Sequence, residues 1–525
     1  MNNSGQELSE ILDKLNNIGI ALSKEANIDT LLEKILEATL EILNADGGTL
    51  YRLTQENSLK FTIIQNKSLN IKMGGTSGIP IPFPEIPLIV NGEHNHGAIA
   101  AHCAITKTSV NIHDAYTAEG FDFSGAKAFD AKTGYRTQSV LAIPLINHDG
   151  IVLGVLQFIN CLNKNNEVIE FNELKETVAE SLGSQAGIAL QNRLLINQLN
   201  ELFEGLINLI NTAIDEKSPY TGGHCLRVPE LTNMLADAAN DETEGPLAHF
   251  SMNEADRYEL KIAGMLHDCG KITTPVHVVD KATKLETIFD RIQLIETRFE
   301  IIRRDMQIAY LEKTLQAPSK QAEAKQALDA QLKMLDESLA FLRVCNVGGE
   351  RMKPEDIERV KEIQQISWTD QSGNQQALLT ENEVENLTIV AGTLTQAERE
   401  TINYHIVATI KLLEQLPWPQ HLKRVTEFAG GHHERMDGKG YPKGLTREQM
   451  SPQARMMGIA DIFEALTASD RPYKKGMKLS QSLSIMHRMK EEQHIDADLF
   501  DVFIKHKLYL DYAKRYLKPE QIDID

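Results

Sequence analysis

Two adjacent histidines, His432 and His433, stand in the stretch GGHHERMDGKGYPKGL at residues 430–445. Imidazole nitrogens are common ligands of divalent transition metals, and imidazole also transfers protons near neutral pH. A histidine pair is nevertheless more often a structural or surface feature than a functional one. Its interpretation therefore depends on whether the chain offers further ligands of the same kind.

A second set of such residues surrounds His267 and Asp268, which end an apolar helical pattern in LKIAGMLHDCGKI. Imidazole and carboxylate together can bind a divalent metal. Lys271 follows His267 by four residues, so we expect it on the same helix face, where its ammonium group could bind a phosphate. The dipeptide alone is common by chance. Its weight comes from His224 upstream and Asp461 downstream, which complete the ligand order of a metal-dependent phosphohydrolase.

The histidine pair then has a place beside these four residues. His432 and His433 suit a second metal ion, with Asp268 bridging the two ions and His405 in LTQAERETINYHIVATIKLL as the third ligand. Two ions ~3.5–4 Å apart can generate a bridging hydroxide at neutral pH. They also stabilise the attacking and leaving oxygens of an in-line displacement at phosphorus. The residues therefore predict a binuclear phosphohydrolase.

Four segments in order, HDCGK, ERETINYHI, HHERMDGKGYPKGL and IADIFEALTASDRPYK, resemble the HD-GYP family of bacterial cyclic di-GMP phosphodiesterases over roughly residues 200–290 and 390–515. The resemblance implies hydrolysis of cyclic di-GMP to pGpG, GMP or both by metal-activated hydroxide. It implies two divalent ions, most commonly iron or manganese, with zinc or nickel as alternatives. The metal ligands that it assigns are His224, His267, Asp268, His405, His432, His433 and Asp461.

The same resemblance assigns the groups that handle the substrate. Asp268 and Lys271 take the catalytic roles, with Lys271 on the scissile phosphate. Arg471 and Lys474 in DRPYK would contact the nucleotide. The loop that gives the family its name would shape the substrate pocket and offer a surface to a partner signalling domain; its residues here are Gly440, Tyr441 and Pro442.

The chain departs from the family pattern in three places. Ser218 stands where most relatives have Asp, which removes a second-sphere hydrogen bond but no ligand. Tyr220 stands where relatives with a third metal have Glu, so two metals are expected. Residues 285–392 separate HD from His405, which leaves His277 in PVHVVDK as a rival third ligand. The remaining histidines show no comparable order, and we interpret them as structural or surface residues; they include His94, His96, His102 and His494.

The N-terminal part resembles a GAF domain over roughly residues 20–190, through NADGGTLYRL, VNIHDAYT, FDAKTGYRTQSVLAIPL and GVLQFINCLNK. Cyclic-nucleotide-binding members carry Asn-Lys, a later Phe and Asp-Glu. The corresponding residues here are Asn163, Lys164, Phe171 and Glu176, with Lys175 in place of Asp. Two interpretations stay open, a cyclic-nucleotide sensor and a domain that binds another small molecule or only dimerises.

Hydrophobic periodicity gives the elements that position these groups. Residues 7–45 read as helix, and five later apolar runs read as strands of an antiparallel sheet: TLYRL, LKFTII, SVNIH, VLAIPLI and IVLGVLQFIN. From about residue 172 a long helix follows, and its leucines step by four and three as in a coiled-coil seam: Leu195, Leu199, Leu202, Leu206 and Leu209. The seam predicts a parallel homodimer that transmits a signal. The alternative is a helix packed on its own domain.

We therefore expect a multidomain protein whose parts differ in fold class. An α+β GAF domain with an N-terminal helix occupies residues 1–190, and a connecting helix occupies 172–214. An all-α HD-type domain occupies 215–525 and carries an insertion at 285–392. Within the insertion, 285–345 reads as an antiparallel helical hairpin, hypothetically a dimer contact, and 346–392 as polar and loop-rich.

Composition narrows the partners. A formal charge of −20 over 525 residues disfavours nucleic-acid polymers and anionic membranes. The five cysteines are scattered and the chain shows no signal peptide or ~20-residue apolar run, so we expect a cytoplasmic protein with reduced thiols. Two alternatives to the phosphodiesterase stay open. One is a catalytically quiet cyclic-dinucleotide receptor or partner-binding protein, and the other is a phosphohydrolase of another cyclic dinucleotide.

Overall fold

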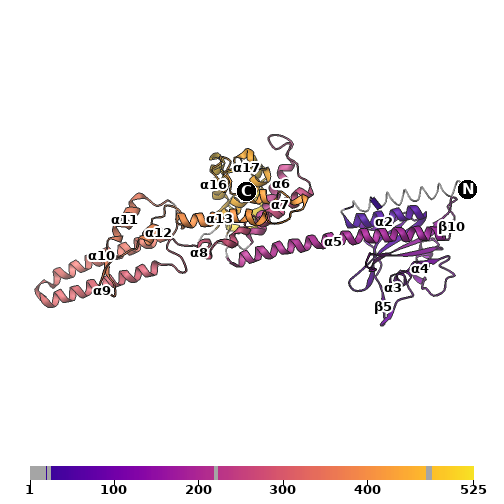
Figure 1. Cartoon of the computed structure of the whole chain (residues 1–525), viewed down its shortest axis with the longest axis horizontal. Coiled ribbons are helices and arrows are strands. Elements are labelled where there is room, and N and C mark those ends of the chain that lie inside the picture. The colour runs from indigo at the N-terminus through magenta and orange to yellow at the C-terminus, as the bar shows by residue number, and fades with distance from the viewer. Residues whose placement is uncertain are drawn as a thin grey trace. The chain divides into compact units, whose positions relative to one another are not determined.

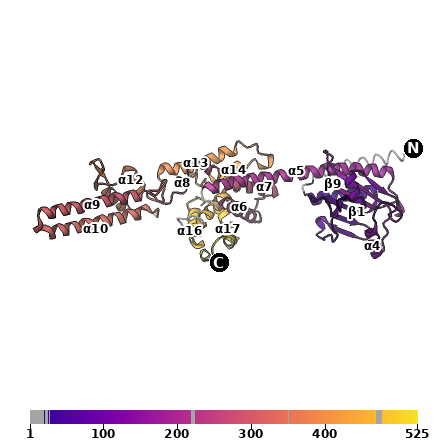
Figure 2. The same ribbon diagram turned by 90° about the horizontal axis from the view of Figure 1, so that it is seen from below.

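The computed structural model describes residues 19–20, 25, 27–217, 223–349, 351–468 and 476–524 (Figures 1 and 2). The chain divides into two compact units, Met1–Phe203 and Glu204–Asp525. Among the helices that the structure describes, none combines the length and apolar character needed to cross a bilayer. Residues 7–18, 21–24 and 26 of the predicted N-terminal helix lie outside the described residues, as do Ser218, Tyr220, Arg471 and Lys474. The C-terminal part of that helix is present as α2 Ile28–Leu43.

The first unit is built on an antiparallel eight-stranded sheet with the order β3-β2-β1-β9-β8-β7. Short strands β4 and β10 pair with β2 and β9. All five predicted strands are present. The elements of this unit are α2 Ile28–Leu43, β1 Ala45–Leu53, β2 Ser58–Asn66, β3 Ile71–Gly74, η1 Gly75–Ser77, β4 Ile86–Pro87, β5 Ile89–Val90, β6 Glu93–His94, α3 Ile99–Thr106, β7 Val110–Ile112, α4 Ser124–Thr133, β8 Val140–Ile146, β9 Val152–Leu162 and β10 Val168–Ile169.

Helices cover both faces of this sheet (Figure 1). Leu141, Ile143 and Leu145 of β8 join the core beneath α2 and the first part of the next helix, α5 Glu173–Lys217. Val140 and Ala142 of the same strand join the opposite core beneath α3. Because successive side chains of a strand point to opposite faces, a strand buried on both faces needs a continuous apolar run. The run VLAIPLI satisfies that requirement.

Helix α5 continues from the first unit into the second as one 45-residue element. Its predicted seam leucines are not buried by the described residues: Leu195, Leu199, Leu202, Leu206 and Leu209 are 46%, 64%, 61%, 51% and 64% exposed. Ile207, within the seam, and Ile214, after it, are instead 2% and 3% exposed. The seam therefore does not pack on its own domain within the described chain, and it remains available to a second copy.

The second unit is helical. Its helices outside the insertion are α6 His224–Asn240, α7 Glu254–Leu266, η2 Cys269–Thr273, α8 Val276–Val279, α13 Gln396–Leu413, η4 Gln420–Leu422, α14 Val425–Gly430, η5 Arg447–Gln449, α15 Pro452–Thr467, α16 Leu479–Glu491, α17 Ala497–Lys505, α18 Leu508–Tyr516 and η6 Pro519–Gln521. Capping boxes begin α7, through Asn253 and Asp256, and α13, through Thr395 and Glu398. Helix α6 packs against α7 and α15, α14 contacts α7 and α13, and η2 packs on α13.

The insertion forms the predicted helical hairpin, but the hairpin begins later than predicted. It consists of α9 Ile292–Gln316, η3 Pro318–Lys320 and α10 Gln321–Asn346. The predicted seam residue Ile288 is 96% exposed and not helical. A local turn competes with helix there, because the Glu286 carboxylate accepts hydrogen bonds from the backbone N–H groups of Ala282 and Thr283. The apolar period alone could not detect that competition.

The segment after the hairpin is more ordered than predicted. It contains α11 Pro354–Gln364, β11 Ser367–Thr369, β12 Gln375–Ala377 and α12 Glu381–Leu387. Several of its apolar residues are buried with those of the hairpin in one core, to which this segment contributes Val360, Ile363, Leu378, Leu379, Val384 and Leu387. The polar composition of the segment reflects its outer surface, so the prediction of a loop-rich stretch was wrong.

Candidate metal centre

His224, His267 and Asp268 form the first cluster of metal-ligand groups, and one ligand atom from each lies within 4.8 Å of the others. His224 begins α6, whereas His267 and Asp268 directly follow α7. The His224 Nε2 atom lies 3.2 Å from His267 Nε2 and 3.2 Å from Asp268 Oδ2. Asp461, on α15, places Oδ1 3.3 Å from His224 Nε2. The four residues predicted for the first metal therefore lie together.

His405, His432 and His433 form the second cluster, again with ligand atoms within 4.8 Å of one another. The Nε2 atoms of His405 and His433 are 3.1 Å apart. Asp268 lies between the clusters, because its Oδ1 is 3.4 Å from His405 Nε2 while its Oδ2 faces His224. This is the arrangement expected of a carboxylate that bridges two ions.

Backbone carbonyls orient three of these rings. The Nδ1 atoms of His267, His405 and His432 bond to the carbonyl oxygens three residues earlier, those of Gly264, Ile402 and Ala429. With Nδ1–H donating to the backbone, Nε2 is the nitrogen left to bind a ligand. In all three residues, Nε2 is therefore the ring nitrogen that is directed toward the cluster.

Two buried atoms of the centre lack a hydrogen-bond partner among the described residues, His432 Nε2 and Asp268 Oδ1. Buried polar atoms normally have partners, so one such atom in each of two adjacent clusters indicates a site for a bound group. A set of imidazole nitrogens and carboxylate oxygens fits iron, manganese, zinc or nickel. The residues present therefore fit the predicted divalent metals.

At the second cluster, the pKa shifts favour the protonation states that can bind a metal ion. Burial, together with neighbouring His433 and His267, holds the pKa of His432 well below its usual value. Burial lowers the pKa of His433 to about 4, so both rings are neutral at pH 7. Burial opposes ionisation of Asp268, but Lys271 and His267 outweigh it and hold the carboxyl pKa well below its usual range. The neutral His432 and His433 rings near an ionised carboxylate suit a cation. At the first cluster, burial opposes protonation of His224, but Asp268, Asp461 and Glu464 outweigh burial and raise the pKa of His224 well above its usual value.

Glu464 is a part of the centre that the sequence interpretation missed. Its carboxylate accepts hydrogen bonds from His224 Nδ1 at 2.6 Å and from Arg227 Nε at 2.8 Å. Burial opposes ionisation of Glu464, but His224 and Arg227 outweigh it and lower its pKa. The side chain is 1% exposed. Glu464 follows Asp461 by one helical turn, and that i, i+3 spacing was the signal available in the sequence.

Lys271 reaches the centre by a different route from the one predicted. Helix α7 ends at Leu266, so Lys271 lies on η2 and not on a helix face shared with His267. Its Nζ donates to Asp268 Oδ2 at 2.5 Å. The tight turn depends on Gly270, where a Cβ atom would lie 2.0 Å from the carbonyl oxygen of His405. Gly270 thus lets η2 lie directly against α13.

A cavity of about 500 Å³ opens beside the second cluster. Gly440 and Tyr441 line it as predicted, and the Tyr441 ring stacks on His433 with centroids 4.8 Å apart. At Gly440 a Cβ atom would lie 2.4 Å from the backbone nitrogen of Arg435, so only glycine fits. Pro442 and Lys271 are not among the lining residues. The lining includes three basic side chains that the sequence interpretation left out, Arg435, Lys439 and His494.

His277, the rival third ligand, is exposed on α8 and belongs to neither cluster. The GAF motif residues line neither cavity described for the first unit. Asn163 closes the turn between β9 and β10, Phe171 is buried in the core, and Glu176 accepts a hydrogen bond from Asn111. Lys175 donates to the Leu43 carbonyl at 2.5 Å, an anchoring role that an aspartate could not take.

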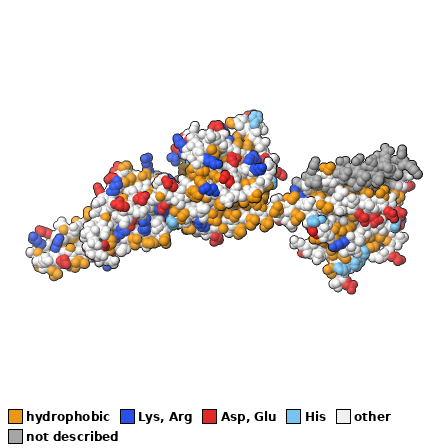
Figure 3. Space-filling view, viewed as in Figure 1, with side chains coloured by type: hydrophobic (Ala, Val, Ile, Leu, Met, Phe, Trp, Pro, Cys, Tyr) orange, Lys and Arg blue, Asp and Glu red, His pale blue; other side chains and the backbone are white. Residues whose placement is uncertain are grey.

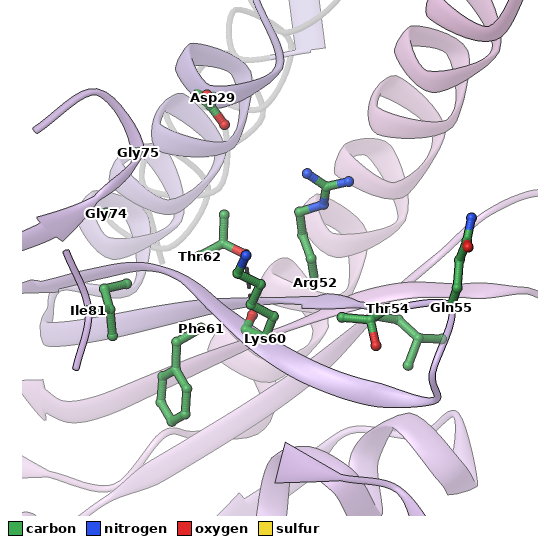
Figure 4. Close-up of a pocket in the computed structure, with 11 residues that line it drawn as sticks. Asp29, Arg52, Thr54, Gln55, Lys60, Phe61, Thr62, Gly74, Gly75 and Ile81 are labelled. Carbon is green, nitrogen blue, oxygen red and sulfur yellow. Dashed lines mark hydrogen bonds between the residues drawn. The ribbon is translucent and has the colours of Figure 1, made fainter. Parts of the chain in front are cut away.

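Among the described residues of the first unit lie two cavities of similar size. One of about 580 Å³ is walled by aromatic and aliphatic side chains, and Glu85 and Asp122 are the charged residues among the described residues that line it. The other, of about 550 Å³, receives Arg52 and Lys60 from directly paired positions of β1 and β2 (Figure 4). The first cavity suits an apolar molecule and the second an anion.

Comparisons with known proteins agree with this architecture. A family model described as GAF domain matches residues 27–190, and two described as HD domain match residues 221–337 and 381–499. The chain therefore combines a GAF domain with an HD-type region.

Similar curated proteins include the 3'3'-cGAMP-specific phosphodiesterase 1 of Vibrio cholerae, 42% identical over 81 residues, which are 15% of this chain and 19% of the relative. A cyclic di-GMP phosphodiesterase of Pseudomonas aeruginosa is 48% identical over 75 residues, or 14% and 17% of the two chains. These matches span less than a fifth of each relative. The GAF domain of an Acinetobacter phosphoenolpyruvate-protein phosphotransferase aligns over 36% of this chain and 98% of its own, at 15% identity and a TM-score of 0.27.

Proposed function

We propose that the protein is an HD-GYP phosphodiesterase that hydrolyses cyclic di-GMP to pGpG, GMP or both with two divalent metal ions, most commonly iron or manganese. One observation carries the proposal: Asp268 lies between two histidine clusters, with its Oδ1 and the Nε2 of His432 buried and without hydrogen-bond partners among the described residues. The names of the similar proteins support a cyclic-dinucleotide substrate.

The proposed roles follow from the geometry around the clusters. When bound, the two ions supply an activated water and neutralise charge on the phosphodiester. Asp268 offers one oxygen to each cluster, and the carbonyl-anchored histidines keep Nε2 directed at the ions. Lys271 holds its ammonium beside Asp268, where it can receive a non-bridging phosphate oxygen.

The cavity next to the second cluster is the proposed binding site for the rest of the dinucleotide. Tyr441 offers an aromatic surface for a base, and Arg435 and Lys439 supply positive charge for the second phosphate. These local cations reconcile an anionic substrate with a protein of net charge −20. Arg471 and Lys474 keep their proposed nucleotide contacts, and the loop at Gly440–Pro442 keeps its proposed role as a partner surface.

Regulation is proposed to enter through the GAF domain. We assign its small-molecule ligand to the 580 Å³ cavity, whose charged lining side chains are both acidic. An apolar, uncharged molecule fits that lining better than a cyclic nucleotide does. The signal would then pass along α5 in a parallel homodimer formed through the exposed leucine seam. The proposed domains keep the predicted bounds, 1–190, 172–214 and 215–525.

The decisive experiment is hydrolysis by protein purified without oxygen and supplied with Fe(II) or Mn(II). Cyclic di-GMP and 3'3'-cGAMP are offered in parallel, and the products are separated. A variant with His267→Ala and Asp268→Ala should lose activity, whereas the matched control His277→Ala should keep it. Faster turnover of 3'3'-cGAMP would refute the choice of substrate. Two bound metals without turnover of either nucleotide would favour another substrate or a GAF-inhibited state. Protein that binds no metal would refute the enzymatic proposal in favour of a receptor.

A further inference from the structure

Three histidines gather on the GAF domain, outside the candidate metal centre. His94 ends β6, His96 lies in the loop that follows, and His102 lies on α3. The Nδ1 atoms of His96 and His102 are 3.0 Å apart. The ring centroids of His96 and His102 are 4.9 Å apart, and those of His94 and His96 are 6.0 Å apart. Figure 3 shows histidine side chains gathered on this part of the surface, near β5 and β6.

The 3.0 Å between the two ring nitrogens is a hydrogen-bond distance when one ring carries the proton, and it is also close to the spacing of two nitrogens bound to one metal ion. Two imidazole nitrogens ~2.0–2.1 Å from one tetrahedral ion lie ~3.3 Å apart. Within the same chain, the pairs His224–His267 and His405–His433 of the candidate centre have Nε2 separations of 3.2 and 3.1 Å. The His96–His102 pair therefore has nearly the same geometry as ligand pairs assigned on independent grounds.

We propose that His96 and His102 bind a divalent transition-metal ion through their Nδ1 atoms, with the exposed His94 turning in as a third ligand. An all-imidazole set selects zinc, nickel or copper over magnesium and calcium. The site is separate from the phosphodiesterase chemistry and does not depend on it.

The position of this site links it to the apolar cavity of the GAF domain. Ala98, Ile99 and Ala100 begin α3 and line that cavity. The Phe121 ring packs on His102 at 5.3 Å between centroids, and the next residue, Asp122, also lines the cavity. An ion that joins the β6–α3 loop to α3 would therefore stiffen one wall of the cavity. The inferred role is a metal input to the sensory domain.

The test counts zinc on full-length protein stripped with a chelator and retitrated with Zn(II) against a chromogenic competitor. The His96→Ala/His102→Ala variant should bind one zinc fewer per chain than the wild type. The matched control is His113→Ala/His148→Ala, which removes two exposed histidines of the same domain and should bind as many zinc ions as the wild type. Equal stoichiometry in the wild type and the His96/His102 variant would overturn the site.

Further measurements test whether the loss of one zinc is caused by loss of this site and not by unfolding or by a change in the HD centre. Because His96 and His102 are at least partly exposed, their removal should leave the circular dichroism spectrum and the unfolding temperature of the metal-free protein unchanged. His94→Ala should weaken the additional zinc at least tenfold without abolishing it, and unchanged affinity would remove His94 from the ligand set. The count is repeated in the His267→Ala/Asp268→Ala background, where a persisting difference of one zinc confirms that the site lies outside the HD centre.

Discussion

Replacing Glu464 by glutamine tests whether the carboxylate behind His224 supports the metal centre. The Glu464 Oε2 atom is 2.6 Å from His224 Nδ1, and its other oxygen bonds Arg227. Glutamine keeps the size and one acceptor but removes the charge that makes the imidazole a stronger ligand. Loss of such an outer partner typically weakens metal binding about 10–100-fold, or about 1.4–2.7 kcal/mol.

The assay is competitive titration of Mn(II) or Fe(II), read beside the unfolding temperature of the metal-free protein. Glu464→Gln should raise the dissociation constant of at least one of the two ions about 10–100-fold. It should also lower activity at limiting metal concentration. Activity should recover at saturating metal. Glu491→Gln, an exposed residue of α16, removes the same charge and should change nothing. The reasoning is refuted if Glu464→Gln binds both ions as the wild type does.

Three further changes test other parts of the structure. The buried ammonium of Lys281 bonds the Asn386 side chain and pairs with Glu398, so it ties the insertion to the start of α13. Lys281→Met should cost about 3–5 kcal/mol in chemical denaturation, whereas Lys261→Met in the partly exposed pair with Glu204 should cost under about 1 kcal/mol. Equal costs would contradict this anchoring role of Lys281. Gly270→Ala places a Cβ atom 2.0 Å from the His405 carbonyl oxygen and should lower the number of metal ions bound per chain, measured by elemental analysis. Two metal ions bound at wild-type affinity would contradict this prediction. Leu199→Glu/Leu202→Glu should convert a dimer to monomer in analytical ultracentrifugation because these side chains are 64% and 61% exposed on the seam. The control Asn200→Glu should remain dimeric. A wild-type sedimentation profile for the leucine variant would exclude the seam as the dimer contact.

The clustering of the candidate metal ligands could be predicted because each motif contains a ligand type whose position is fixed by local structure. His267 and His432 follow helices whose last-turn carbonyls orient them, so a few residues of sequence determine which nitrogen is presented. His405 could be assigned across about a hundred residues only through the family resemblance. The proximity of His405 to Asp268 is a tertiary property that no local pattern contains.

The errors have equally specific causes. Lys271 was placed on a helix because the apolar period of α7 continues to His267, whereas the close approach of Gly270 to α13 is a long-range packing constraint. Arg435 and His494 were missed because their role depends on a cavity formed by segments far apart in sequence. The order of residues 346–392 was missed because its buried residues are sparse and complete a core supplied mainly by the hairpin.

The long insertion lies between His267-Asp268 and His405 in the sequence. His405 can still lie beside Asp268, because the two ends of the insertion are tied together at its base. The chain leaves at Lys281, whose fully buried ammonium bonds the Asn386 side chain and the Glu398 carboxylate at the start of α13. It returns past Thr393, whose hydroxyl donates to the Lys281 carbonyl at 2.9 Å.

Lys284 strengthens the same junction. Its backbone nitrogen bonds the Asn346 carbonyl at 2.9 Å, and its ammonium bonds the carbonyls of Leu387 and Ile389. These contacts fix the start of α13 relative to the HD segment, and α13 is the helix that carries His405. The length of the hairpin beyond the junction is then free to vary without moving His405, because the closed base sets the position of α13. A longer insertion adds only a slowly growing entropy cost.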